Sequence, residues 1–307
     1  MCSKQHTNNS KEHTSNHKRH VNSNKQHWKD KLHNNILWIL FLSILLLSIG
    51  DFVLLPLFPE IEESHAFLFT FNEYFYFIGT WISVMAAILM VRRNRYILGA
   101  IGSKAQGNTI PFLLAGFAAG FILNGFSALV AGLHGDYHLD FVKFEFLPAL
   151  ALFFSVFVQS SAEEVLCRGF TYQRLLKSTN KPAIAIGINA LFFAAIHLFN
   201  DGITPLAFYD LLITGVFFSL VVYYFDSLWM AMGIHTTWNY TQSIVLGLPN
   251  SGSSFPYSIF QLDTGHVSSS FAYDVGFGLE GTILSAGVMT ACSIGLYLWK
   301  RKEKPLL

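Results

Sequence analysis

Long apolar runs constrain the fold of this chain more than any other feature of its sequence. Only 13% of the 307 residues are charged, against about 25% in soluble domains. A helix needs ~20 apolar residues to cross the hydrocarbon core of a bilayer. The sequence therefore predicts an all-α, polytopic membrane protein with about eight transmembrane helices. The eight spans can be drawn as Ile36–Phe58, Ala66–Val91, Thr109–His134, Phe144–Phe170, Pro182–Leu198, Leu206–Phe225, Leu228–Leu248 and Val275–Trp299.

Lysine and arginine are sorted to one side of this eight-span arrangement. The N-terminal tail holds seven of the 20, and the segments 92–104, 168–181 and 300–304 hold four each. Only Lys143 falls on the other side. Short loops rich in Lys and Arg stay in the cytoplasm, so we expect both termini to be cytoplasmic and the loop 249–276 to lie outside.

The first 34 residues are polar and contain half of the twelve histidines, namely His6, His13, His17, His20, His27 and His33. These side chains could bind a metal, but a segment so rich in Asn, Lys and Ser has too little apolar surface to fold. We therefore divide the chain into a disordered cytoplasmic tail (1–34) and a transmembrane helical domain (35–307). No glycine-rich phosphate loop and no basic–aromatic patch is present in the sequence, so nucleic acid is not expected as a partner.

The stretch "EEVLCR" places ionisable groups inside the fourth span. Membrane proteins hide such groups from lipid, and the groups commonly face a cavity and carry function. Glu164 and Arg168 stand four residues apart, so they share a helix face and can form an ion pair. Glu163 lies about 100° round the helix from Glu164. It is therefore available for another purpose.

Two further motifs, "FAAIH" and "HTTWN", add imidazole and amide groups to the fifth and seventh spans. A carboxylate such as Glu163, placed near an imidazole such as that of His197 in a partly dry cavity, can hold and deprotonate a water molecule. A second imidazole, from His235, and the amide of Asn239 can donate hydrogen bonds to an oxyanion. The set thus contains a base and oxyanion donors, but no serine or cysteine paired with a base.

The three motifs in this order, EExxxR, FxxxH and HxxxN, resemble the pattern of the CPBP family. That family comprises the type II CAAX prenyl endopeptidases and their bacterial relatives, the bacteriocin-processing and abortive-infection (Abi) membrane proteins. The resemblance covers roughly residues 144–248, which we take as the catalytic core. It implies an eight-helix intramembrane endopeptidase that acts on a membrane-tethered peptide or protein in the lipid bilayer.

The resemblance also implies a role for each of six side chains. Water would be activated by Glu163 and His197, the oxyanion would be stabilised by His235 and Asn239, and the site would be oriented by Glu164 and Arg168. We expect no cofactor. Zinc is the alternative, held by Glu163, His197 and His235, although two histidines on separate helices without an HExxH motif argue against it.

The depth of two of these residues sets a condition on the fold. As drawn, Glu163 and His197 lie near opposite ends of their spans, ~20 Å apart at 1.5 Å per residue. A shared site therefore requires that the fourth span continues toward Lys177, or that the fifth span begins later or is broken.

Two other function classes fit parts of the sequence. Intramembrane acidic and imidazole groups also form the proton relays of transporters. However, the first three spans contribute only Asp51, Glu73 and Asn124, and no inverted repeat is visible. A non-catalytic immunity or scaffold protein of the same fold is the other alternative. Asp210, at the start of the sixth span, could belong to the site or face the lipid headgroups. The breadth of the family and the compact loops favour a bacterial cell membrane over the endoplasmic reticulum.

Overall fold

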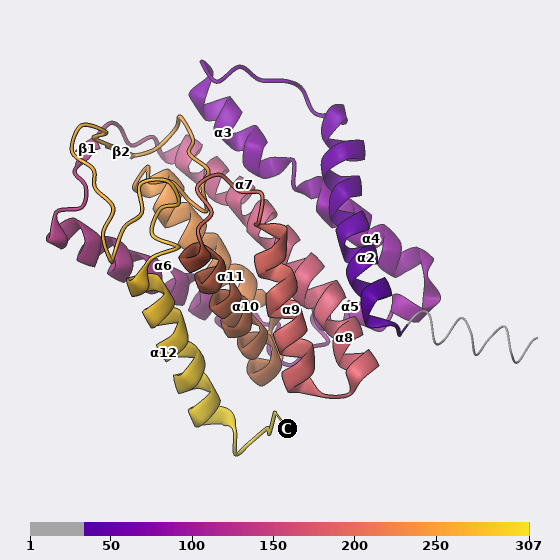
Figure 1. The fold of residues 1–307 in the computed structure, drawn as a ribbon. Coiled ribbons are helices and arrows are strands. Elements are labelled where there is room, and N and C mark those ends of the chain that lie inside the picture. The colour runs from indigo at the N-terminus through magenta and orange to yellow at the C-terminus, as the bar shows by residue number, and fades with distance from the viewer. Residues whose placement is uncertain (1–33, 307) are drawn as a thin grey trace, which may run out of the picture.

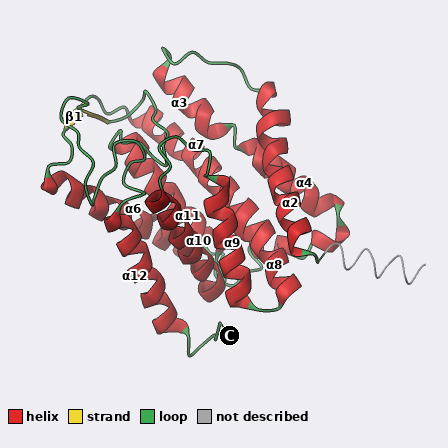
Figure 2. Cartoon of the chain, viewed as in Figure 1, coloured by secondary structure: helices red, strands yellow, loops and turns green. Residues whose placement is uncertain are grey.

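The computed structural model describes residues 34–306, so the predicted tail, apart from Asn34, lies outside the described residues. Each of the eight predicted spans contains a helix, and the helices pack into one bundle (Figure 1). Figure 2 shows that helices dominate the described chain. Its two short strands, β1 (Leu139–Phe141) and β2 (Phe260–Leu262), pair antiparallel in a loop region. The predicted all-α polytopic fold is confirmed.

The helices of residues 34–306 fall into three kinds. The α-helices are α2 (Ile36–Ser48), α3 (Ala66–Phe75), α4 (Ile78–Met90), α5 (Ile97–Ile101), α6 (Ile110–His134), α7 (Phe146–Glu164), α8 (Tyr172–Thr179), α9 (Pro182–Ile196), α10 (Pro205–Phe225), α11 (Leu228–Asn239) and α12 (Ile283–Lys300). Segments of π-helix extend α2, α7 and α11 as η1 (Ile49–Leu54), η4 (Val165–Thr171) and η5 (Tyr240–Val245). Short 3-10 turns are η2 (Leu55–Leu57) and η3 (Arg92–Asn94).

Six helical segments of the described chain are long and apolar enough to cross a bilayer: Ile36–Val53, Ala66–Met90, Ile110–His134, Phe146–Thr179, Pro205–Phe225 and Ile283–Lys300. The fifth predicted span is a shorter apolar helix, α9. The seventh predicted span contains α11, which is less apolar. Every residue from Ala231 to Asn239 is buried among other helices. A helix enclosed by protein does not need the hydropathy that lipid contact demands.

The last predicted span begins later than expected, at Ile283 instead of Val275. The Thr282 side chain caps α12 by accepting a hydrogen bond from the Ser285 N–H. Just before it, Gly278 and Gly281 have φ values of 100° and 77°. These left-handed conformations favour glycine and do not continue a helix. The apolar run therefore includes a turn that composition alone did not reveal.

The fourth predicted span is longer than expected, because α7, η4 and α8 form one continuous segment of 34 residues ending at Thr179. The prediction that it ends at Phe170 is wrong. Arg168, which was counted among the loop residues, is instead buried within this segment.

The hairpin formed by α8 and α9 explains how Glu163 and His197 can lie at a similar depth in the bundle. Glu163 lies sixteen residues before Thr179, and His197 lies fifteen residues after Pro182. At 1.5 Å per residue, both are about 22–24 Å from the turn that joins the two helices. Helix α9 is also too short to cross a hydrocarbon core of ~30 Å. The two residues therefore lie at similar depth within the bundle.

Helices α6 and α11 approach each other closely at two glycines of α6. A Cβ atom on Gly120 would lie 2.1 Å from the Ile234 carbonyl oxygen, and one on Gly116 would lie 2.4 Å from that of Met230. Small residues spaced four apart let membrane helices make such contacts. This packing supports α11, the helix that carries the third motif.

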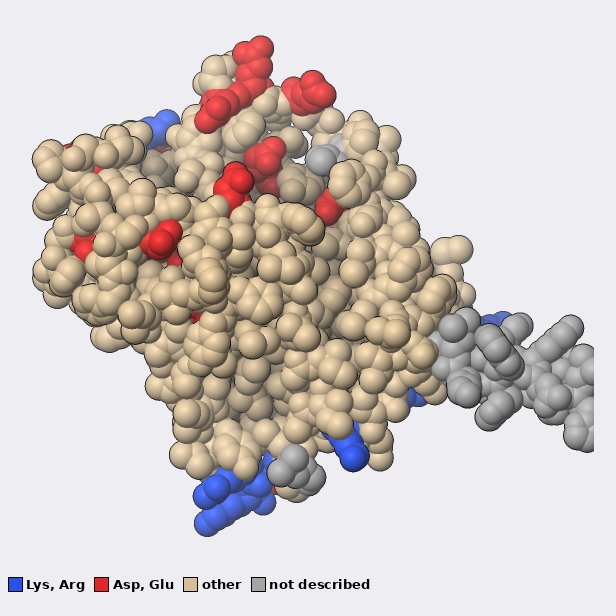
Figure 3. Space-filling view, in the orientation of Figure 1, with Lys and Arg blue, Asp and Glu red and all other residues tan. Residues whose placement is uncertain are grey.

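Charge separates the two ends of the molecule. Figure 3 shows acidic side chains gathered at the end near α3, basic ones mostly at the end near α8 and the C-terminus, and a largely uncharged band between them. The described chain ends meet the α8–α9 turn: the Ser178 hydroxyl donates to the Asn34 carbonyl, and the Ala183 N–H donates to the Leu306 carbonyl at 3.3 Å. The positive-inside rule therefore predicts that this end faces the cytoplasm.

This orientation can be tested with single cysteines in a chain whose native cysteines are replaced. Thr264 and Lys302 are both exposed, at opposite ends of the molecule. We expect Thr264→Cys to react with a membrane-impermeant maleimide in intact cells, and Lys302→Cys to react only after permeabilisation. The opposite labelling pattern would show that the orientation is reversed.

Candidate active site

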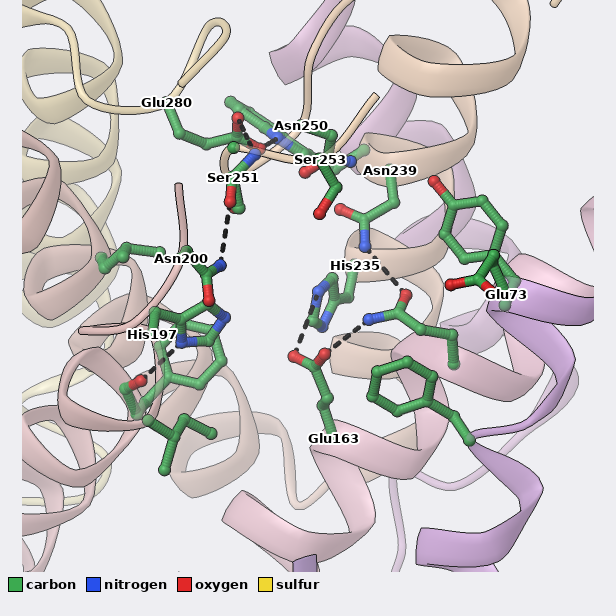
Figure 4. A pocket seen from close by; sticks show the side chains of 18 of the residues that line it. Glu73, Glu163, His197, Asn200, His235, Asn239, Asn250, Ser251, Ser253 and Glu280 are labelled. Carbon is green, nitrogen blue, oxygen red and sulfur yellow. Dashed lines mark hydrogen bonds and ion pairs between the residues drawn. The ribbon is translucent and has the colours of Figure 1, made fainter. Parts of the chain in front are cut away.

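A cavity of about 580 Å³ lies among α3, α7, α11 and the turn that follows α9 (Figure 4). The backbone segment from Asn250 to Phe255 forms part of its wall. Four of the predicted site residues line this cavity: Glu163, His197, His235 and Asn239. The structure thus brings together side chains from three separate helical segments.

The adjacent glutamates have different surroundings. Glu163 lines the cavity, and its Oε2 atom has no hydrogen-bond partner among the described residues. Glu164 is fully buried away from the cavity, and its Oε1 atom accepts a hydrogen bond from Nη1 of Arg168 at 2.9 Å. The predicted pairing of Glu164 with Arg168 is therefore present, and Glu163 remains on the cavity side.

Arg168 is enclosed by aromatic rings. Its side chain is fully buried, and its Cζ atom lies 4.3 Å from the ring centre of Phe193 and 5.2 Å from that of Phe218. A guanidinium binds an aromatic face more strongly when both are shielded from water. This contact gives a physical reason for the phenylalanine of the FAAIH motif, because Phe193 covers the cation that pairs with Glu164.

His235 bridges the two glutamates. Its Nδ1 atom lies 3.0 Å from Glu164 Oε1, and its Nε2 atom lies 3.9 Å from Glu163 Oε2. An ionised carboxylate only accepts hydrogen bonds, so Nδ1 carries the proton in this contact. Glu164 therefore fixes the orientation of the imidazole and directs Nε2 toward Glu163.

Gln159 is a site residue that the motifs did not identify. Its Nε2 donates to Glu163 Oε1 at 2.5 Å, and its Oε1 accepts from Asn239 Nδ2 at 3.0 Å. The amide thus links the first motif to the third (Figure 4). Gln159 stands four residues before Glu163, a spacing that places it on the same helix face. That spacing was the only signal in the sequence, since a neutral amide inside a span is unremarkable by itself.

His197 faces Glu163 across the cavity (Figure 4). Its Nδ1 atom lies 2.7 Å from the carbonyl oxygen of Phe193. Because a carbonyl oxygen only accepts, Nδ1 carries the proton, and Nε2 is the free acceptor of a neutral ring. Among the described residues, no hydrogen bond or ion pair joins His197 directly to Glu163.

The three residues considered as zinc ligands do not converge. Within residues 34–306, no group of three or more His, Cys, Asp or Glu side chains is placed to hold a metal ion. Glu163 and His235 lie close together, whereas His197 is on the opposite wall. Zinc ligation needs donor atoms about 2.0–2.2 Å from a common centre. The donor geometry therefore does not fit zinc.

Glu280 attaches the long loop that follows η5 to the cavity wall. Its carboxylate accepts hydrogen bonds from Trp238 Nε1 at 2.6 Å, from Gln242 Nε2 at 2.7 Å and from the Ser251 N–H at 3.3 Å. Burial raises the pKa of the Glu280 carboxyl, while the hydrogen bonds from Trp238 and Gln242 oppose that rise. The contacts hold the loop against α11 and its π-helical extension.

Two other intramembrane polar residues lie apart from the cavity. Asp210 is 1% exposed, and its Oδ2 accepts a hydrogen bond from the Gly281 N–H at 3.0 Å. It therefore neither faces the headgroups nor lines the site, but holds the turn before α12. Asn124 donates to Gln242 Oε1 at 2.7 Å. Both side chains connect helices.

We expect Arg168→Ala to destabilise the protein strongly. The change would leave Glu164 as a buried carboxylate without its cation, and breaking a buried pair from one side costs about 3–5 kcal/mol. The measurement is the melting temperature and folded yield in detergent. Lys177→Ala, which removes a positive charge from an exposed position on the same helical segment, is the control. Equal melting temperatures for the two variants would contradict a structural role for the Glu164–Arg168 pair.

One family model matches the part of the chain that carries the three motifs. Residues 145–241 match the family model described as type II CAAX prenyl endopeptidase Rce1-like. A search of curated proteins and a search of solved structures found no match. The matched residues contain all three motifs and extend from the residue before α7 into η5. The segment from α7 to α11 therefore carries an Rce1-like domain, and the predicted relation to the CPBP intramembrane proteases is confirmed.

Proposed function

We propose that the protein is an intramembrane endopeptidase that hydrolyses a peptide bond of a membrane-associated protein or peptide with a water activated by Glu163. The observation that carries this proposal is the contrast between the glutamates. Glu164 lies away from the cavity and accepts hydrogen bonds from Arg168 and His235, whereas Glu163 lines the cavity and, among the described residues, is hydrogen-bonded only to the neutral amide of Gln159. A membrane helix retains such a carboxylate at high energetic cost, which favours a catalytic role.

The geometry supports Glu163 as a base whose position is fixed by a hydrogen bond, while no lysine or arginine among the described residues pairs with it. Gln159 fixes one oxygen of Glu163, and the other lies 3.9 Å from His235 Nε2. That separation is too long for a direct hydrogen bond, but one water oxygen or one substrate oxygen can contact both atoms. Glu163 would take a proton as the water oxygen bonds to the carbonyl carbon. It would then return that proton to the departing amine as the carbon–nitrogen bond breaks.

The two histidines suit different tasks in this reaction. Neutral His197, with Nδ1 bonded to the Phe193 carbonyl, offers Nε2 as an acceptor that can orient a water. In its protonated form, His235 would donate from Nε2 to the oxyanion while Nδ1 stays bonded to Glu164. Asn239, whose Nδ2 is held by Gln159, lies on the same wall and would supply a second donor. Integral, multi-pass insertion fits the apolar helices, and a bacterial cell membrane remains our prediction.

Variants of the cavity test the proposed roles. On a membrane-tethered peptide, Glu163→Gln should abolish cleavage, because an amide cannot take the proton of water. His197→Ala and His235→Ala should each lower turnover, and Asn239→Ala should lower it ~10²–10³-fold through loss of one oxyanion donor. Glu145→Gln, which changes an exposed glutamate outside the cavity, should cleave like the wild type. Cleavage by Glu163→Gln at the wild-type rate would refute the proposal.

We also propose that the reaction needs no metal, since the candidate ligands do not converge on one point. Dialysis of the purified protein against a strong chelator should leave turnover unchanged. Loss of turnover that returns on addition of zinc would show that the metal-free mechanism is wrong, while leaving the endopeptidase activity itself established.

A further inference from the structure

The wall of the cavity carries one sign of charge. Among the described residues that line it, the acidic side chains are Asp51, Glu73, Glu163, Asp201 and Glu280, and none is a lysine or arginine. A cleft lined by one sign of charge between low-dielectric walls concentrates oppositely charged ligands. The cavity is therefore suited to a guest with positive charge.

Asp51 and Glu73 distinguish this wall from the other buried acidic sites of the protein. Glu164 is paired with Arg168, Glu280 accepts three hydrogen bonds, and Asp210 accepts one from a backbone N–H. In contrast, no salt bridge between described residues involves Asp51 or Glu73, and the buried Oδ1 atom of Asp51 has no partner among them. Each of the other three carboxylates accepts at least one hydrogen bond from the protein, whereas Asp51 and Glu73 make none with the described residues.

The carboxylates of Asp51 and Glu73 also lie within helices that could cross the membrane. Asp51 lies in η1, within the candidate span Ile36–Val53, and Glu73 lies within the candidate span Ala66–Met90. Acidic side chains at such positions are costly unless they face a cavity and a partner. The π-helical segment that holds Asp51 is a local irregularity of a kind that recurs at functional sites.

The two residues share one end of the cavity with the candidate base. Tyr76, the residue that follows α3, lines the cavity together with Asp51, Glu73 and Glu163. Glu163 is 9% exposed, and its Oε2 atom is unpaired and directed into the same space. This unpaired oxygen is independent evidence that the cavity is built for a ligand, with Asp51 and Glu73 beside the reacting position.

The approach to the cavity has the same sign. Asp201, Glu280 and the segment from Asn250 to Phe255 belong to loops at the end opposite the described chain ends. Glu60, Glu62 and Glu63 are exposed in the loop that joins η2 to α3, and Figure 3 shows acidic side chains gathered at the end near α3. A cationic segment arriving from this face meets a favourable potential along its whole path.

We propose that the substrate carries a lysine or arginine close to the cleaved bond, and that Asp51 and Glu73 bind this side chain. The inference rests on the proposed endopeptidase function and adds the charge of its substrate. Two carboxylates on different helices can contact one extended cationic side chain, while the bond beside that residue reaches Glu163. Their partial burial makes the attraction stronger than at an exposed surface, since screening by water and salt is reduced.

The test uses the full-length protein in liposomes with a set of membrane-tethered peptides. At each position in turn, the peptide carries lysine, its neutral isostere norleucine, or glutamate. At one position, the wild type should cleave the lysine peptide ~10-fold or more faster than the norleucine peptide, measured as kcat/KM. In the double variant Asp51→Asn/Glu73→Gln, this ratio should fall to near one. The ratio does not depend on how much of the protein is folded.

Matched variants make the result specific. Asp140→Asn/Glu145→Gln removes two exposed carboxylates outside the cavity and should keep the preference for lysine. Glu73→Lys should shift the preference toward the glutamate peptide, and Glu73→Gln alone provides the ratio if the double variant does not fold. A wild type that cleaves lysine and norleucine peptides equally, or a ratio unchanged in Glu73→Gln and in the double variant, would overturn the inference while the endopeptidase stands. If no peptide is cleaved, the proposed function fails and the inference fails with it.

Discussion

The Glu164 carboxylate is the interaction on which the site depends. One of its oxygens binds Arg168 at 2.9 Å and His235 at 3.0 Å, all within the bundle. The contact with His235 links the α7–η4 segment to α11, and the rings of Phe193 and Phe218 shield the guanidinium of Arg168. A buried charge of either sign alone would be costly. Together they form a rigid polar centre in an apolar protein, and the imidazole beside Glu163 takes its orientation from it.

The architecture around this centre sets the depth of the chemistry. The continuous segment Phe146–Thr179 carries both glutamates through the middle of the bundle, and the short helix α9 ends where His197 is needed. Glycines on α6 let α11 approach closely, and Glu280 holds the loop that follows η5 against the same helix. The cavity that results is lined by residues of α7, α9 and α11 and by loop residues such as Asp201 and the segment from Asn250 to Phe255.

Much of this arrangement could be predicted from the sequence, because apolar length and four-residue spacing act locally. The approximate positions of the helices and the Glu164–Arg168 pair follow from such patterns. That Glu163, His197, His235 and Asn239 share one cavity was implied by the resemblance of the three motifs to the CPBP family. Other features depend on tertiary contacts that no local pattern encodes. The fourth helix extends to Thr179, beyond the predicted end at Phe170, because polar residues after Phe170 are enclosed by neighbouring helices, which the hydropathy of the sequence does not show. Gln159 is a neutral residue whose importance appears only when α11 is beside it. Asp51 and Glu73 were visible as isolated intramembrane acids, but only folding brings them to the cavity that contains Glu163.

The central claim is that two adjacent glutamates divide structure from chemistry. The most direct test compares Glu163→Gln with Glu164→Gln, two nearly isosteric changes at neighbouring positions, by melting temperature and by turnover of the same preparation. The account predicts that Glu163→Gln melts like the wild type but does not turn over, whereas Glu164→Gln melts at a clearly lower temperature because Arg168 loses its counterion. A Glu163→Gln protein that melts as low as Glu164→Gln, or that retains turnover, would contradict it.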